Sequence, residues 1–144
     1  MLQCSNETFI NYFDIGKFMK ILSREEEKSA LEFIKGSAQL AQKSTCRRSN
    51  CGSLIVRGNM VIGKGWNSPP ADKKSQQRCI HAKESYHTKV TDKTCCVHAE
   101  QRAIMDALRH NPTKMAGSRL YFVRLDEQGK PARVGKPYCT ICSK

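Results

Sequence analysis

The sequence predicts an α/β protein in which helices cover the faces of a mixed sheet. Two segments have helical patterns, residues 23–44 and 98–110, and three have the apolar, β-rich character of strands, residues 52–57, 60–67 and 119–124. The order helix, strand, strand, helix, strand is typical of a layered α/β domain. At 144 residues the chain suits one domain with a single core.

The first helix is marked at its N-terminus by Ser23 and Glu26, which have the spacing of a capping box. Glu25 and Glu27 place further negative charge where the helix dipole favours it. One apolar face follows at spacings of three and four, formed by Leu31, Ile34, Ala38 and Ala41. We expect this helix to end near residue 43 or 44 and to cover one face of the sheet.

The first two strands are predicted to form a hairpin around Gly58-Asn59, with Gly58 in the positive φ of a type II′ turn. Leu54, Ile55 and Val56 are consecutively apolar, so we expect the first strand to be buried on both faces.

Residues 68–97 show no sustained period, and a loop of this length is usually functional or tied down. A bound metal ion is one candidate for what holds this loop in place, because the segment contains Cys79, His81, His87, Cys95 and Cys96. The helix at 98–110 follows and stops at Asn111-Pro112. Its predicted apolar stripe is Ala99, Ala103, Ile104, Ala107 and Leu108.

Composition narrows the class of protein. Hydrophobic residues make up 39% and charged residues 26%, as in a soluble globular domain. There is no apolar run of membrane-spanning length and no secretory pattern in the first fifteen residues, so we expect a cytoplasmic protein without a membrane partner.

Eight cysteines in such a chain favour metal binding over disulfides. The net charge of +12 indicates attraction to phosphates, on a nucleotide or a nucleic acid, or simply a basic surface.

The residue types that carry chemistry are His98 and Glu100 at the start of a helix and the pair Cys139 and Cys142 near the end of the chain. They supply three zinc ligands, which leaves the fourth position for water, as catalytic zinc sites do. The carboxylate of Glu100 can move protons on and off that water. Alone, a His-x-Glu motif more often lies on a solvated helix surface. A Cys-x-x-Cys motif alone is more often a structural zinc site or a redox pair. The combination of the two motifs favours a catalytic zinc site.

Three segments in order, residues 51–69, 96–104 and 137–142, resemble the cytidine/deoxycytidylate deaminase family, and within it most the deoxycytidylate branch. The first ends in Gly65-Trp66-Asn67, the second carries His98-Ala99-Glu100, and the third the Cys pair. The resemblance implies a three-layer α/β/α fold around a mixed sheet.

The same resemblance implies a mechanism and a substrate. His98, Cys139 and Cys142 would hold the zinc ion, zinc-bound hydroxide would attack C4 of cytosine, and Glu100 would shuttle protons. The expected reaction is hydrolytic deamination of dCMP to dUMP, with a small pyrimidine nucleotide as partner. The backbone N–H of Ala99 would face the base and Asn67 would contact the sugar. Asn67 also suits a turn without any ligand.

A second, structural zinc is implied for some relatives and would pin the long loop. The candidate ligands here are Cys46, Cys79, Cys96 and one of His87 or His81, and the alternative is that these are buried thiols. Cys51 and Cys95 are the expected spares.

Two departures from the family pattern affect the end of the chain. Tyr138 stands between Pro137 and Cys139, and the sequence stops at Lys144. The family's later helix and strands would follow the Cys pair, so we expect a fold cut short there, or a sheet completed by another subunit. We expect one domain over residues 1–144, with an N-terminal helical segment at 1–44 and a catalytic core at 45–144.

Two other functions fit parts of the sequence. One is a base deaminase acting on tRNA or single-stranded DNA, and the other is a non-catalytic zinc module that binds nucleic acid. Glu100 argues against the module, because pure binding does not need it. Oligomers are common in proteins resembling this one, so a homo-oligomer is expected.

Overall fold

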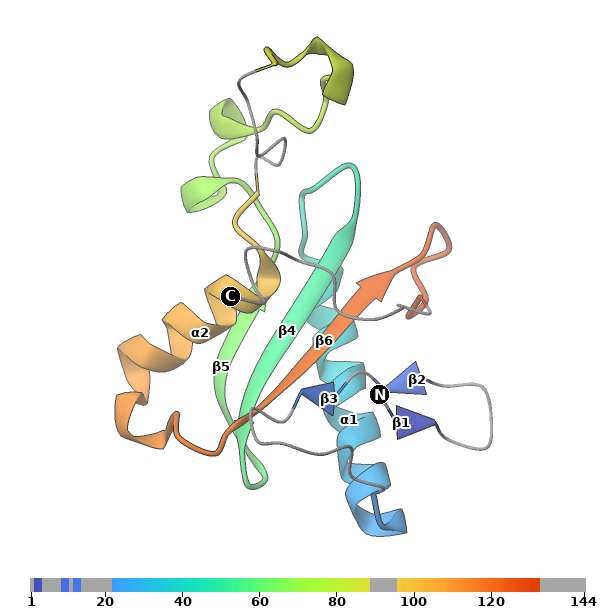
Figure 1. The fold of residues 1–144 in the computed structure, drawn as a ribbon, viewed down its shortest axis with the longest axis vertical. Coiled ribbons are helices and arrows are strands. Elements are labelled where there is room, and N and C mark those ends of the chain that lie inside the picture. The colour runs from blue at the N-terminus through green and yellow to red at the C-terminus, as the bar shows by residue number, and fades with distance from the viewer. Residues whose placement is uncertain (1, 4–8, 11, 14–21, 89–95, 133–144) are drawn as a thin grey trace.

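The structure is a computed structural model that describes residues 2–3, 9–10, 12–13, 22–88 and 96–132 (Figure 1). The helices of more than one turn are α1 (Arg24–Ala41) and α2 (Ala99–His110). The strands are β1 (Leu2–Gln3), β2 (Phe9–Ile10), β3 (Tyr12–Phe13), β4 (Asn50–Arg57), β5 (Met60–Trp66) and β6 (Arg119–Leu125). The short 3-10 segments are η1 (Pro70–Asp72), η2 (Lys74–Gln76), η3 (Lys83–Ser85) and η4 (Pro112–Lys114).

The main sheet has the strand order β3-β6-β4-β5, and β1 pairs with β2 in a separate two-stranded sheet. Every pair among these described strands is antiparallel. A parallel pair, which a mixed sheet requires, would have to involve a strand outside the described residues. The short strands β1 to β3 lie in a segment where the sequence has no clear period, because two-residue strands are too short to produce one.

The helices α1 and α2 lie on opposite sides of the sheet, which gives three layers (Figure 1). Leu54 and Val56 of β4 pack in one core cluster with Ile34 of α1, whereas Ile55 packs in a second cluster with Ala103 of α2. The layered α/β fold class is therefore confirmed, and so is the burial of β4 on both faces.

The predicted capping box of α1 is present. Ser23 N–H donates to Glu26 Oε2 at 3.0 Å, and Glu26 N–H donates to Ser23 Oγ at 3.3 Å. The helix ends at Ala41, slightly earlier than residue 43 or 44. The next turn tightens, because Lys43 N–H donates to the carbonyl of Leu40 three residues back. None of the described helices is long and apolar enough to cross a membrane.

The hairpin between β4 and β5 has the predicted turn, with Gly58 at φ +59°. Helix α2 then packs against β5 through small residues. Gly63 and Gly65 admit the helix so closely that a Cβ on Gly65 would lie 2.2 Å from the carbonyl oxygen of Ala99. Two side chains also satisfy backbone groups on the outer edge of β5. Asp106 of α2 accepts from Lys64 N–H at 2.9 Å, and Asn111, the C-cap residue of α2, donates to the Ile62 carbonyl at 3.0 Å.

The predicted apolar stripe of α2 is correct for its alanines and wrong for its larger members. Ala99, Ala103 and Ala107 are fully buried, but Ile104 is 37% and Leu108 is 50% exposed. The close approach allowed by the glycines of β5 leaves room for a row of alanines only, so the bulky side chains lie beside the contact and not in it.

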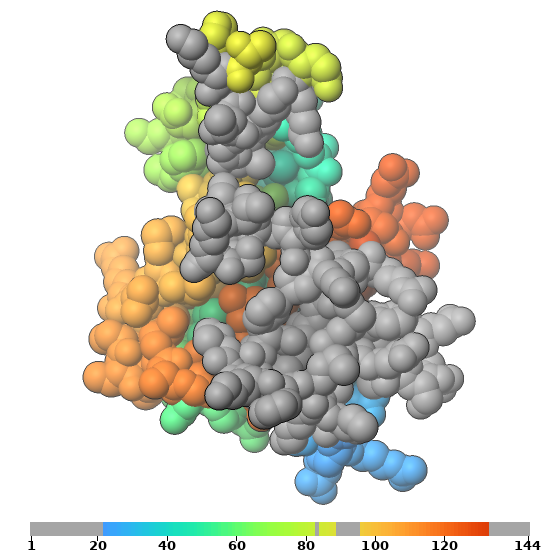
Figure 2. Space-filling model, in the orientation of Figure 1, coloured from blue at the N-terminus to red at the C-terminus, as the bar shows by residue number. Residues whose placement is uncertain are grey.

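The segment after β5 carries only short 3-10 turns in its described part, residues 68–88 and 96–97. In the space-filling view, the green-to-yellow residues of this segment project as a lobe above the orange α2 (Figure 2). The prediction of a long loop without sustained secondary structure is thus confirmed for these residues.

Candidate active site and a neighbouring thiol cluster

The two candidate chemical residues of the central motif lie at the N-terminus of α2. His98 is the N-cap residue, with φ −67° and ψ 151°, and Glu100 lies in the first turn. Gln101 fixes this end of the helix, because its Oε1 accepts the backbone N–H of His98 at 3.2 Å. Both His98 and Glu100 are half-buried. This suits side chains that are held by the protein on one side and can contact a ligand on the other.

This helix end is joined to the turn that follows β5. Val97 N–H donates to the Ser68 carbonyl at 2.9 Å in an isolated β-bridge. The bridge places the residue before His98 against the residue after Asn67, so the second and first motifs of the sequence meet here. Ala99, whose backbone N–H is predicted to face the base, is fully buried against β5.

Asn67 is 8% exposed, and its side-chain amide is hydrogen-bonded through both its oxygen and its nitrogen. Its Oδ1 accepts from Cys51 N–H at 2.8 Å, and its Nδ2 donates to the Ser49 carbonyl at 2.7 Å. These contacts pin the turn to the beginning of β4, which is the structural role that the sequence allowed for Asn67. Contact with a sugar stays a prediction.

Cys51, expected to be a spare thiol, lies beside the candidate site. Burial raises the pKa of the Cys51 thiol, the hydrogen bond with Ser49 works in the opposite direction, and the negative charge of nearby Glu100 raises the pKa further. The net effect is a pKa of the Cys51 thiol above its ordinary value, and the charge of the candidate proton shuttle is one of its causes. The sequence gives no signal for this, since the proximity arises from β4 and α2 meeting in space.

A second cluster gathers three of the cysteines predicted for a structural metal. The sulfur atoms of Cys46, Cys79 and Cys96 all lie within 4.8 Å of one another. None of them is joined in a disulfide. The Sγ of Cys79 accepts the backbone N–H of Arg47 at 3.5 Å and the side chain of Gln77 at 3.4 Å, and such donors stabilise a thiolate.

This donor set fits zinc. Sulfur ligands at ~2.3 Å in a tetrahedron lie roughly 3.8 Å apart, so the three thiols need to close by no more than about 1 Å. His87 and His81 are described but do not belong to this three-sulfur group, so a fourth ligand stays a prediction. The other predicted or spare cysteines, Cys95, Cys139 and Cys142, lie outside the described residues, and the complete catalytic ligand set is therefore not seen together.

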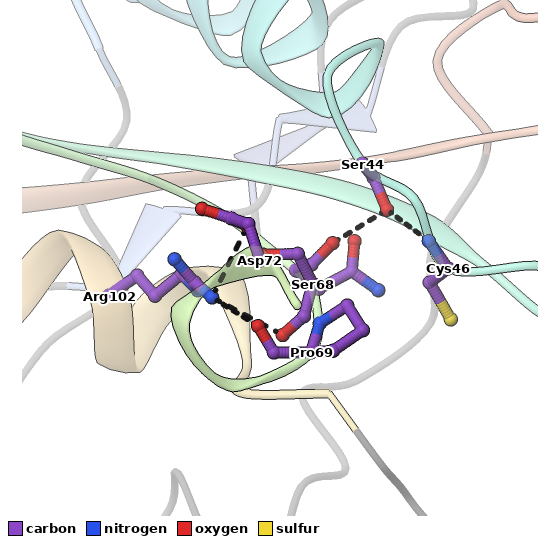
Figure 3. Close-up of polar contacts among 7 residues, drawn as sticks. Ser44, Cys46, Ser68, Pro69, Asp72 and Arg102 are labelled. Atoms are coloured by element: carbon purple, nitrogen blue, oxygen red, sulfur yellow. Dashed lines mark hydrogen bonds and ion pairs between the residues drawn. The ribbon is translucent and has the colours of Figure 1, made fainter. Parts of the chain in front are cut away.

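The thiol cluster and the candidate active site are connected through Ser44. Its Oγ donates to the Asn67 carbonyl at 2.7 Å and accepts the backbone N–H of Cys46 at 3.2 Å (Figure 3). On the opposite side of the same turn lies Arg102 of α2, whose guanidinium reaches Pro69 and Asp72 (Figure 3). Sequence reasoning did not single out Arg102, because an arginine on a helix is usually a solvated residue.

The sequence matches a known protein family and is similar to named proteins of that family. The family described as the cytidine and deoxycytidylate deaminase zinc-binding region matches residues 26–144. A deoxycytidylate deaminase of Schizosaccharomyces pombe is 33% identical over 82 residues, which are 54% of this chain and 25% of that protein. A deoxycytidylate deaminase of Mycobacterium phage D29 is 29% identical over 98 residues, which are 64% of this chain and 74% of that protein.

Among solved structures, the dCMP deaminase of the cyanophage S-TIM5 in complex with dCMP and dUMP has a TM-score of 0.44 and 20% identity, covering 62% of this chain and 59% of that one. Its apo form has a TM-score of 0.41 and 21% identity over the same shares. The chain thus spans a quarter of the yeast relative and less than two thirds of the cyanophage enzyme.

Proposed function

This chain belongs to the cytidine and deoxycytidylate deaminase family, and we propose that it performs the hydrolytic deamination of a cytosine nucleotide, with dCMP as the substrate. Two relatives that carry the name deoxycytidylate deaminase support this choice of substrate. The products would be dUMP and ammonia.

The observation that carries the proposal is the placement of Glu100. It lies in the first turn of α2, two residues after His98, and at the end of the helix that is bridged to the turn holding Asn67. A structural metal site has no use for a half-buried carboxylate at this point. A hydrolytic deaminase needs one, because protons must move from water to the base and the leaving amine.

Zinc, when bound by His98, Cys139 and Cys142, would lower the pKa of a water molecule so that hydroxide is available near neutral pH. Glu100 would take up the first proton that this water releases and deliver it to N3 of the pyrimidine. It would then carry the second proton, from the hydroxyl group added at C4, to the amine, so that the C4–N bond breaks, ammonia leaves and the C4 carbonyl of dUMP remains. The buried N–H of Ala99 would hold the base through its O2 atom.

We further assign the three thiols of Cys46, Cys79 and Cys96 to a structural zinc that stabilises the lobe after β5. The mutual distance of 4.8 Å and the N–H donors on Cys79 support this assignment. Three thiolates leave one position of a tetrahedron to be filled, for which His87 is the proposed ligand.

The proposal is tested by measuring ammonia release from dCMP, CMP, deoxycytidine, cytidine and a cytosine-containing oligonucleotide. We expect turnover of dCMP and none of the oligonucleotide. The same panel run with Glu100→Ala should show no turnover, while the zinc content stays that of the parent. Turnover of the oligonucleotide alone would replace the nucleotide by a nucleic acid as substrate. Bound zinc without turnover of any substrate would contradict a deaminase activity for this chain.

A further inference from the structure

The segment that follows β5, residues 67–72, includes η1 and is held to α2 by one arginine. We call these six residues the strap. Nη2 of Arg102 donates to the Pro69 carbonyl at 2.8 Å and to the Ser68 carbonyl at 3.4 Å. It also forms an ion pair with Asp72 at 3.5 Å, and Asp72 in turn accepts a hydrogen bond from Ser68 Oγ (Figure 3).

The backbone of the strap is in a conformation that it would not adopt alone. Ala71 and Asp72 both lie in the left-handed region, with φ of 53° and 55°. Residues with a Cβ are unfavourable there, and two in succession persist only where the surroundings hold them. The surroundings here are the contacts of Asp72 with Arg102 and Ser68, so the guanidinium maintains a shape that the sequence of the strap does not favour.

The strap begins at the residue predicted to contact the substrate. Asn67 is fixed on one side by β4 through its amide and by Ser44 through its carbonyl. Its neighbour Ser68 is fixed to Val97, just before His98. Arg102 supplies the side-chain contact from α2, and its own side chain is 20% exposed. The strap is thus clamped between the sheet and the helix that carries Glu100.

We propose that Arg102 is a positioning residue that sets the strap, and with it the sugar end of the substrate pocket. The proposal rests on the proposed deaminase function and adds a residue to it. Arg102 acts through Asn67 and not on the reacting base. His98 and Glu100 are placed by the packing of α2 on Gly65, which does not depend on the guanidinium. Loss of Arg102 therefore raises KM and leaves kcat close to that of the parent.

Kinetics of Arg102→Gln test this split, with Arg109→Gln as the matched control. Arg109 is an exposed arginine on the same helix and makes none of the strap contacts given above. We expect Arg102→Gln to raise KM for dCMP about tenfold, the effect of ~1.4 kcal/mol, with little change in kcat. Arg102→Lys should recover only part of the loss, because its ammonium group keeps the charge but stands on a shorter side chain than Nη2 of Arg102, which makes all the strap contacts. An unchanged KM, or an equal rise in Arg109→Gln, would overturn the proposal.

Hydrogen exchange provides a measurement that does not require turnover. The N–H groups of Asp72 and of Lys73, the residue after the strap, donate to strap carbonyls, to Pro69 at 2.9 Å and to Pro70 at 3.2 Å. We expect both to exchange about tenfold faster in Arg102→Gln than in the parent, because their protection depends on local opening. If the parent shows no turnover but the exchange increases, the deaminase proposal fails and the clamp stands. Unchanged exchange would refute the clamp.

Should Arg102→Gln fail to fold, Asp72→Asn replaces it. This variant removes the ion pair and keeps the bonds of Arg102 to the two carbonyls. KM and the exchange rates should then move in the same direction by a smaller factor. Parent values for both in Asp72→Asn would overturn the proposal.

Discussion

Gly65 of β5 lies directly against Ala99 of α2, so closely that a Cβ at residue 65 would be 2.2 Å from the Ala99 carbonyl oxygen and 2.5 Å from the backbone nitrogen of Ala103. The obstructing atoms belong to the helix backbone, which cannot move aside as a flexible side chain can. The contact therefore sets the position of the helix turn that carries His98 and Glu100.

Replacing Gly65 by alanine should push the N-terminus of α2 away from the sheet. Overpacking of this kind costs about 1–3 kcal/mol of unfolding free energy, and we expect deamination to fall by roughly a hundredfold because the proton shuttle shifts. Urea unfolding and dCMP turnover measure the two effects.

Gly58→Ala is the control for that experiment. Gly58 has φ +59°, but a Cβ there would meet no atom within 4 Å. The substitution strains the turn and lowers stability by about 1 kcal/mol without moving α2. Equal activity of the two variants would contradict the positioning role of Gly65.

Cys79→Ser should reduce the zinc content by one ion per chain and lower the melting temperature. Cys79 is 7% exposed and accepts two N–H donors, so its removal breaks the proposed structural site at its most buried ligand. Metal analysis and thermal unfolding are the measurements. Cys51→Ser is the matched control, because Cys51 is outside the three-sulfur group. A Cys79→Ser protein with the parent's zinc content would rule out that site.

Alkylation of Cys51 should require higher pH than alkylation of an ordinary cysteine. The thiolate is the reactive form, and burial raises the pKa of Cys51 in the folded protein. Peptide mass spectrometry after iodoacetamide treatment can follow this residue separately from the other cysteines. We expect the rate to rise only above the value of about 8.5 that is usual for cysteine.

The same pKa shift has a consequence for stability. Because folding raises the pKa, the folded state favours the neutral thiol. This contribution to stability is complete below the unfolded pKa and is lost as the pH rises through the folded value. If the rate of Cys51 alkylation depends on pH in the same way in folded and unfolded protein, folding does not raise the pKa of Cys51.

Asn67→Ala tests whether this side chain is structural, substrate-binding or both. Removing the amide leaves the Cys51 N–H and the Ser49 carbonyl without their partner, at a cost of about 1–3 kcal/mol in unfolding free energy. Urea unfolding gives that number. A rise in KM for dCMP beyond the loss of folded protein would add the predicted sugar contact. An unchanged stability would show that the two hydrogen bonds do not hold the turn.

The sequence predicted those parts of the fold whose causes are local. The capping box of Ser23 and Glu26 and the positive φ of Gly58 depend on a few neighbouring residues, and both are present. The exposure of Ile104 and Leu108 was missed, although Gly63 and Gly65 were a usable signal. Glycines within a strand often mark a close approach of another backbone, which excludes large side chains from the contact.

Contacts across the chain were less predictable. The family resemblance implied Cys46, Cys79 and Cys96 as ligands of a second metal, and the three thiols do meet in space. The proximity of Cys51 to Glu100 and the clamp of Arg102 on Pro69 have no local pattern. Each joins segments more than thirty residues apart, so only the packing of α2 on the sheet brings them together.

We propose above that Glu100 transfers the protons of a hydrolytic deamination. Its most direct test is the turnover of dCMP by Glu100→Gln, measured together with zinc content and with Glu84→Gln as the control. Glu84 is an exposed carboxylate on η3, outside the α2 motif. We predict that Glu100→Gln loses at least about 10²-fold in kcat at unchanged zinc content, while Glu84→Gln keeps the parent's rate. Parent-like turnover by Glu100→Gln would exclude Glu100 as the group that transfers these protons.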